Sequence, residues 1–219
     1  MKKVLLICAA LLAGALAFGE ATWTHSFGLG AATPFLSMDA DDDGLKNVFA
    51  PQLMARYYAE RSNGFCVQAT LGAGCAMSES FKLGDDSDFA AGVATGLSFG
   101  AGWAFKVSEK LTFSALGSLS FDWSRFKLKK DITARLLYGS LSREWTETND
   151  LLAFGIGAEL LANCKLSDRL SLFISLAARF FDAGALRRKG VKEYIPYSSS
   201  YEIRGTVSVT PAVGVAWTF

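Results

Sequence analysis

The clearest pattern in this chain is an alternation of apolar residues with small or polar ones, and it is most regular in the last nine residues. Because side chains of a β-strand point alternately to its two faces, the apolar positions of this segment would share one surface. These positions are Val213, Val215, Trp217 and Phe219. The chain is therefore predicted to end in a strand with one apolar face, closed by an aromatic residue.

The same period of two predicts eight strands. They are expected at 22–35, 48–60, 65–77, 89–107, 111–137 and 141–166, from 170 onward, and in the C-terminal segment. Three connections are short, and Asn63-Gly64 in the first of them supplies the positive φ of a tight hairpin. The four connections at the opposite end are long, with tips expected near Asp41, Asp85, Gly139 and Tyr194.

One segment has an alternative interpretation as a membrane helix. The stretch from Phe89 to Phe105 has no charged residue, and glycine recurs in it at every fourth position. Its odd positions, however, are mostly large or branched, whereas its even positions are all alanine, glycine or serine. A period of two fits this pattern better than 3.6, so a strand is predicted.

The N-terminal residues predict a secretory signal peptide. Lys2 and Lys3 precede an apolar run from Val4 to Leu16, which is too short to cross a bilayer as a helix. Residues 1–19 are assigned to the signal peptide and 20–219 to one domain. Removal of the two lysines changes the formal charge from +1 to about −1, which gives no reason to expect nucleic acid as a partner.

The cysteines of the mature chain predict neither a disulfide framework nor a zinc site. Cys66, Cys75 and Cys164 are an odd number of residues in apolar, strand-like surroundings, and the first two fall on opposite faces of one strand. We interpret them as small packing residues.

The predicted strands are joined by short turns at one end and long connections at the other, and aromatic residues lie near the short turns. This pattern resembles the eight-stranded bacterial outer-membrane family of OmpX and the OmpA barrel domain. The resemblance implies an all-β fold: an eight-stranded antiparallel up-and-down transmembrane β-barrel with short periplasmic turns and long external loops. It implies a place in the cell outer membrane, contact with outer-membrane lipid, and insertion by the barrel-assembly machinery with the C-terminal strand as signal. A soluble β-sandwich is disfavoured, since it would expose large apolar bands to water.

The hairpin with arms 111–137 and 141–166 is expected to protrude far beyond the membrane. About 10 residues per strand suffice to cross a bilayer, and these arms are more than twice that length. Alternation continues at Ile132, Ala134 and Leu136, so the sheet is expected to continue outside.

Charged residues at inward positions predict a lumenal ion pair between Glu159 and Arg179. A three-residue turn at 167–169 places Glu159 opposite Ala177 and diagonal to Arg179, within reach of long side chains. The pair would act as a structural plug; the alternative is a gate or an ion path.

Loop residues suggest two binding chemistries. Asp39, Asp41 and Asp43 precede Gly44 as in the first half of a calcium loop, but the closing position holds Ala50, so the alternatives are a solvated acidic loop and a weak Ca²⁺ site. No other cofactor is expected. Basic residues form a patch for which the alternatives are a solvated loop surface and a binding site for an extracellular polyanion, a lipid phosphate or a host ligand. The patch comprises Lys127, Lys129, Lys130, Arg187, Arg188 and Lys189.

The single histidine argues against an enzyme. His25 would lie near the short turns, far from the external loops in which a surface hydrolase would need it. We therefore predict a non-enzymatic, surface-exposed protein that is structural or adhesive through its loops, with no catalytic residues. A lipid- or peptide-modifying outer-membrane enzyme is the least favoured alternative. The other alternative is a narrow channel for small or hydrophobic solutes, which requires that four aromatic side chains leave the lumen free. These are Tyr58, Phe126, Phe173 and Phe181.

Overall fold

The computed structural model describes residues 22–37, 47–79, 89–136, 139–192, 195–202 and 205–219, and these ranges form one antiparallel sheet. The sheet contains eleven strands within the described ranges. Their bounds are β1 Trp23–Ala32, β2 Phe35–Ser37, β3 Asn47–Phe49, β4 Gln52–Arg61, β5 Phe65–Glu79, β6 Phe89–Lys106, β7 Leu111–Leu136, β8 Gly139–Lys165, β9 Leu170–Lys192, β10 Ile195–Glu202 and β11 Thr206–Thr218. No helix among these described residues is long and apolar enough to span a membrane.

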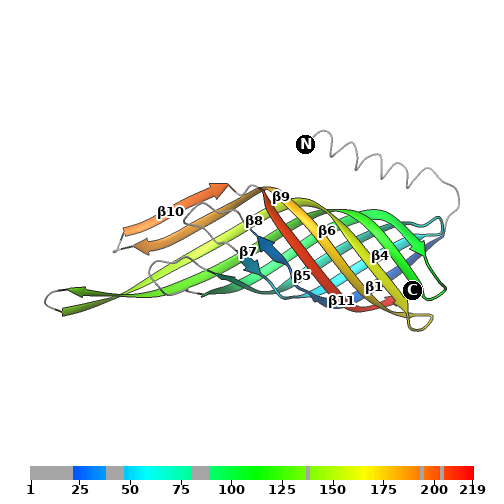
Figure 1. The fold of residues 1–219 in the computed structure, drawn as a ribbon, viewed down its shortest axis with the longest axis horizontal. Coiled ribbons are helices and arrows are strands. Elements are labelled where there is room, and N and C mark those ends of the chain that lie inside the picture. Colours follow the sequence, from blue (N-terminus) through cyan, green and yellow to red (C-terminus); the bar gives the residue numbers. More distant parts are fainter. Residues whose placement is uncertain (1–21, 38–46, 80–88, 137–138, 193–194, 203–204) are drawn as a thin grey trace.

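The sheet closes into a barrel, because β1 pairs with β4 on one side and with β11 on the other. Strand β11 also pairs with β9, which completes the ring (Figure 1). The eleven segments make eight barrel strands, because β1 continues into β2, β3 into β4 and β10 into β11. The predicted eight-stranded antiparallel barrel is therefore confirmed.

Proline lies at two of the three interruptions, and a glycine with positive φ lies next to the third. Pro34 separates β1 from β2 and Pro51 separates β3 from β4, since proline has no N–H to give to a ladder. The proline carbonyl groups are still used: Pro34 accepts from the Ala50 amide at 3.0 Å and Pro51 from the Cys75 amide at 3.1 Å. Gly205, with φ +66°, precedes β11.

Two of the short turns are built in the same way. In one, the Ser108 hydroxyl accepts from the Leu111 amide at 3.1 Å; in the other, the Ser167 hydroxyl accepts from the Leu170 amide at 3.2 Å. Such serine-capped turns satisfy backbone donors that the strands leave unpaired. The third turn relies on Gly64, which has φ +88° as the Asn-Gly pair predicts.

Replacement of Gly64 by alanine is expected to destabilise the barrel by about 1–2 kcal/mol, because an L-residue is strained at positive φ. The new Cβ would also lie 3.0 Å from the Ala104 carbonyl oxygen. Gly117→Ala is the control: its Cβ would meet its nearest neighbour only at 4.0 Å. Urea unfolding in lipid vesicles measures both. Equal losses for the two variants would contradict the role given to the Gly64 backbone.

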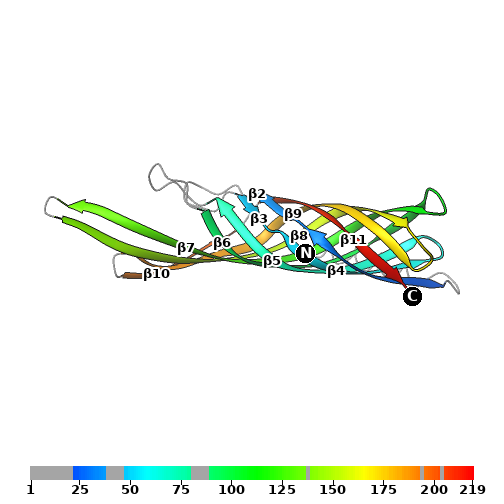
Figure 2. The ribbon, with the colours of Figure 1, turned by 90° about the horizontal axis from the view of Figure 1, so that it is seen from below.

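The longest hairpin extends well beyond the barrel, as the sequence predicts. Strands β7 and β8 remain paired without interruption to Leu136 and Gly139, and β9 and β10 remain paired to Lys192 and Ile195. Figures 1 and 2 both show these strands projecting from the end of the barrel opposite the C-terminus. The projecting part is an open sheet with β7 and β10 as its edges.

The barrel exterior carries a belt of exposed apolar side chains. Along β7, Phe113, Leu119 and Phe121 face outward with Trp123 at the upper end, whereas the alternate positions from Ser114 to Ser124 are buried inside. The ten residue steps from Phe113 to Trp123, at about 3.3 Å each and a tilt of about 40°, rise about 25 Å along the barrel axis. That is the height of the apolar band of a transmembrane barrel.

Candidate functional site

The lumen contains two apolar plugs with a polar band between them. Along β9, Phe173 is followed inside the barrel by Ser175 and Arg179 and then by Phe181; β7 repeats the order with Leu116, Asp122 and Phe126. The lower plug, nearer the short turns, consists of Ala32, Met54, Tyr58, Cys66, Leu116, Leu161, Phe173, Ala212 and Ala216. The upper plug consists of Leu36, Val48, Ala50, Ala76, Ala94, Phe126, Leu151, Ala153 and Phe181.

A buried carboxylate organises the lower half of the polar band. Glu159, which is 2% exposed, accepts from the Arg56 guanidinium at one oxygen and from the Gln68 amide at the other. Arg56 also donates to the Ser175 hydroxyl at 2.9 Å, and its guanidinium carbon lies 4.6 Å from the centre of the Phe173 ring. Strands far apart in the sheet are thus joined across the lumen.

A second ion pair occupies the upper half of the band. The Arg179 guanidinium lies 3.9 Å from a carboxylate oxygen of Asp122 and donates to the Ser98 hydroxyl at 3.5 Å. Ser98 in turn shares a hydrogen bond of 2.6 Å with the Thr70 hydroxyl. Two cations and two anions therefore balance within the described part of the band.

The predicted pairing of Glu159 with Arg179 is wrong, although the register behind it is right. Glu159 does lie opposite Ala177, but its carboxylate turns across the lumen to Arg56, and Arg179 turns to Asp122. In a barrel this narrow, side chains from opposite walls meet. Partners across the lumen compete with diagonal partners on neighbouring strands.

The aromatic side chains that decide between plug and channel fill the lumen. Phe126 and Phe181 have no exposed surface, Phe173 is 1% exposed and Tyr58 is 7% exposed. The small inward residues of β6, such as Gly96 and Ser98, thus face large side chains from other strands. This arrangement argues against a continuous path for solutes through the described lumen.

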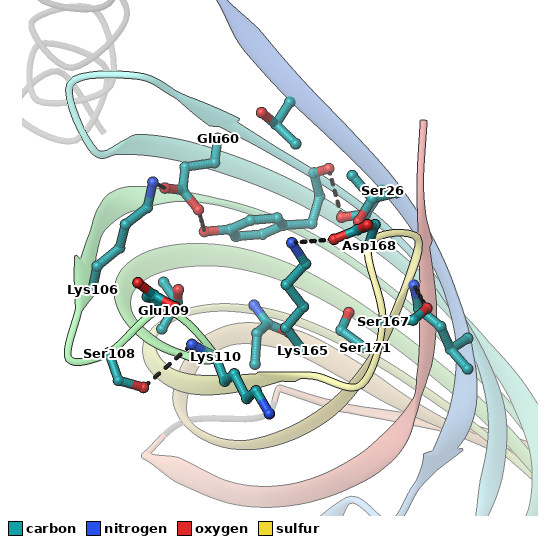
Figure 3. Close-up of a pocket in the computed structure, with 16 residues that line it drawn as sticks. Ser26, Glu60, Lys106, Ser108, Glu109, Lys110, Lys165, Ser167, Asp168 and Ser171 are labelled. Atoms are coloured by element: carbon teal, nitrogen blue, oxygen red, sulfur yellow. Dashed lines mark hydrogen bonds and ion pairs between the residues drawn. The ribbon is translucent and has the colours of Figure 1, made fainter.

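An open cavity of about 530 Å³ lies below the lower plug, at the end with the short turns (Figure 3). The Tyr58 hydroxyl forms part of its lining and lies 2.9 Å from the Ser114 hydroxyl and 3.5 Å from a Glu60 oxygen. Three lysines and three acids balance around it: Lys106, Lys110 and Lys165 with Glu60, Glu109 and Asp168. The cavity has no net charge to select a ligand. Sequence reasoning missed it because its lining comes from turns and strand ends far apart in the chain.

His25 lies at the same end of the barrel, where the sequence places it. Its Nδ1 lies 2.7 Å from the Tyr57 hydroxyl, and its ring stacks on the rings of Tyr57 and Phe219 with centroids 6.0 and 6.2 Å away. The Phe219 amide donates to the His25 carbonyl at 3.0 Å. The histidine therefore holds the last residue of the chain against β1.

The structure describes only part of the predicted loop sites. Three of the basic residues are exposed, Lys127 on β7 and Arg187 and Lys189 on β9. For Lys129, Lys130 and Arg188 the structure describes the strand backbone but not the side chain. The acidic residues Asp39, Asp41 and Asp43 lie outside the described residues. Within the described ranges, no group of three histidine, cysteine or acidic side chains could hold a metal ion. Cys66 is buried and Cys75 and Cys164 are exposed, all as free thiols.

Solved outer-membrane proteins have a similar architecture. A major outer membrane protein from Thermus thermophilus is 16% identical with a TM-score of 0.55, covering 89% of this chain and 99% of that one. Neisserial surface protein A is 11% identical with a TM-score of 0.50, covering 89% and 97%. The chain has the fold of a small outer-membrane β-barrel. The attachment invasion locus protein Ail of Yersinia pestis also matches, at 15% identity and a TM-score of 0.43 over 90% and 98%.

No protein-family model and no curated protein sequence matches the chain. The fold and the apolar belt together locate the barrel in an outer membrane, with its belt in lipid. In barrels of this kind the short turns face the periplasm and the long connections face the outside. The cavity of Figure 3 is then periplasmic, and the projecting sheet is extracellular.

Proposed function

We propose that this protein is a non-enzymatic surface protein, structural or adhesive, that presents a β-sheet on a closed barrel. The observation that supports this role is the continuous pairing of β7 with β8 out to Leu136 and Gly139. A barrel that only had to cross the membrane would need strands of about 10 residues, whereas β7 has 26 and β8 has 27. The excess length forms a paired β-hairpin outside the membrane.

The projecting sheet offers features that suit a binding partner. Beyond the barrel its edge strands β7 and β10 each pair with one neighbour among the described strands, and such edges can accept an added strand. The basic residues Lys129, Lys130 and Arg188 fall within it and would favour an extracellular polyanion or a host ligand with acidic groups.

The C-terminal strand supports the proposed route into the membrane. Val213, Trp217 and Phe219 present an exposed apolar row, and Phe219 is held at the seam by His25. We expect the barrel-assembly machinery to recognise this row before the seam closes.

Electrical recording tests the closed barrel. The protein reconstituted in planar bilayers is expected to show no reproducible conducting steps, because both plugs and the ion-paired band block the lumen. A stable open state in the wild-type protein would overturn this expectation and favour the channel function instead.

A trimmed hairpin tests the display role. Replacement of residues 129–146 by Asn-Gly joins Leu128 to Glu147, which are register partners, so a tight turn can close the shortened hairpin. Cells that display this variant are expected to lose adhesion to sulfated-glycan surfaces while they keep the heat-modifiable gel migration of a folded barrel. Unchanged adhesion would contradict the adhesive role.

A further inference from the structure

A cluster of cations forms on the outer face of β7, β8 and β9, directly above the apolar belt. The register aligns Arg125, Asp150 and Arg187 in one row across the three strands. The next row, one strand repeat farther out, aligns Lys127, Thr148 and Lys189. These two rows thus place four cations and one acid on one surface, with a net charge of +3, and the exposed Glu202 of β10 lies beside the lower row, opposite Ala185.

A β-bulge in β9 brings the last two cations to this face. Gly155 pairs with Phe181 and Phe154 with Ala183, so Asp182 is an extra residue without a partner in the register. Even-numbered residues of β9 face outward up to Phe180, and odd-numbered ones do so from Ala183 onward. Without the extra residue, Arg187 and Lys189 would lie on the opposite side of the sheet.

Arg125 is fixed at the lower edge of the cluster. Its guanidinium donates to the two oxygens of Asp150 at 2.6 and 3.2 Å and lies 5.5 Å from the centre of the Trp123 ring. The hydrogen bond from Arg125 to Asp150 and the charge of Asp150 raise the pKa of Arg125. Trp123 is the uppermost aromatic residue of the belt on β7, a position at which tryptophan marks the membrane interface.

The spacing of the four cations matches a phosphate ligand. Directly opposed residues on neighbouring strands lie about 5 Å apart, and alternate residues of one strand about 7 Å apart. Arg125, Arg187, Lys127 and Lys189 therefore mark a rectangle of about 10 by 7 Å, with the Thr148 hydroxyl between the two lysines. Long, exposed side chains at such corners can converge on one or two phosphate groups.

The height of the rectangle determines which phosphates it meets. The belt from Phe113 to Trp123 accounts for the whole apolar band of about 25 Å. The rectangle begins at the next outward residue, Arg125, and therefore lies where the outer leaflet carries its headgroups. The ligand is then held at the site by the bilayer itself.

We propose that Arg125, Lys127, Arg187 and Lys189 form a binding site for the phosphate groups of an outer-leaflet lipid, which fastens the base of the projecting hairpin to the membrane surface. This site goes beyond the display function and depends only on the membrane placement of the belt. Thr148 contributes a hydroxyl to the same ligand.

Lipid binding to purified wild-type protein and to the Lys127→Gln, Lys189→Gln double variant tests the site. Native mass spectrometry measures retention of bisphosphorylated lipid A, with phosphatidylcholine, a zwitterion whose single phosphate is balanced by choline, as the reference without net charge. Two cations near a membrane surface predict a loss of affinity for lipid A of roughly tenfold to thirtyfold. A Lys127→Arg, Lys189→Arg variant should retain the affinity, and Lys106→Gln, Lys110→Gln at the periplasmic end removes the same charge as a control.

Each outcome decides the proposal. A loss confined to the outer-face variant, in protein with normal heat-modifiable migration, supports the site. Unchanged lipid A binding, or an equal loss in the periplasmic control, overturns it. A third arm uses a heparin oligosaccharide and inorganic phosphate in detergent: if these bind through the two lysines while lipid A does not, the ligand is a soluble polyanion and the lipid assignment is wrong. The trimmed hairpin variant retains Lys127 and Lys189, so its loss of adhesion would test the display function without changing the proposed lipid site.

Discussion

Replacement of Glu159 by alanine is expected to lower the free energy of unfolding of the barrel by about 3–5 kcal/mol. The carboxylate is the charge partner of Arg56 and also accepts from Gln68, and all three side chains are buried. Its loss leaves the Arg56 guanidinium charged inside the lumen, where the Ser175 hydroxyl and the Phe173 ring still contact it but no longer balance its charge. Urea unfolding in lipid vesicles, followed by heat-modifiable gel migration, measures the change.

Two further variants show whether the stability loss comes from burial of the unpaired Arg56 charge or from the loss of any ion pair. Arg56→Met combined with Glu159→Leu removes both charges and should recover most of the stability, because the desolvation cost disappears with them. Asp150→Ala breaks the exposed pair with Arg125 and should cost no more than about 1 kcal/mol. Similar losses for Glu159→Ala and Asp150→Ala would contradict the buried role of Glu159.

Replacement of Phe173 by alanine is expected to cost about 3–5 kcal/mol, because it empties the centre of the lower plug. The ring is 1% exposed and fills the space left by three glycines at the seam between β1 and β11. A Cβ added at Gly214 would lie 2.5 Å from this ring, and one at Gly28 would lie 2.9 Å from it. The same unfolding measurement in vesicles applies.

The contact between the Phe173 ring and Gly28 is tested by combining the two substitutions. In the wild-type barrel Gly28→Ala should destabilise by about 1–3 kcal/mol, because its nearest neighbour is the Phe173 ring. In the Phe173→Ala background the added methyl group enters the cavity, so the same change should cost less than in the wild type, with the Val215 carbonyl oxygen at 3.1 Å as its closest remaining contact. Additive losses in the double variant would show that the two residues do not share this space.

The fold was largely predictable because the lipid outside the barrel and the packed lumen inside it require very different side chains. Outward residues such as Phe113 and Leu119 meet lipid, and inward residues such as Ser114 and Ser118 meet a packed lumen, so alternation is imposed on every strand. The turns are set locally by Gly64 and by serine caps, and the Asn-Gly pair predicted the first of them. Once a short turn fixes the register of two strands, the position of the next hairpin tip along the chain can be calculated.

The lumenal contacts were only partly predictable. Register arithmetic placed Glu159 opposite Ala177 correctly, but Arg56 is 103 residues away and reaches Glu159 across the barrel. The local pattern of one strand does not show which residues of the opposite barrel wall lie at the same height, because that depends on how the sheet closes. The periplasmic cavity depends on the same relation and was missed for the same reason.

The sequence by itself determined the strands, their two faces, the short turns and the long hairpin, because each of these depends on neighbouring residues and on the period of two. The tertiary structure alone decided which charges meet inside and which basic residues share the outer face. Closure of the sheet brings Arg56 to Glu159. The single unpaired residue Asp182 changes the face of every later residue in β9, which is how Arg187 and Lys189 come to lie beside Lys127 at the edge of the membrane.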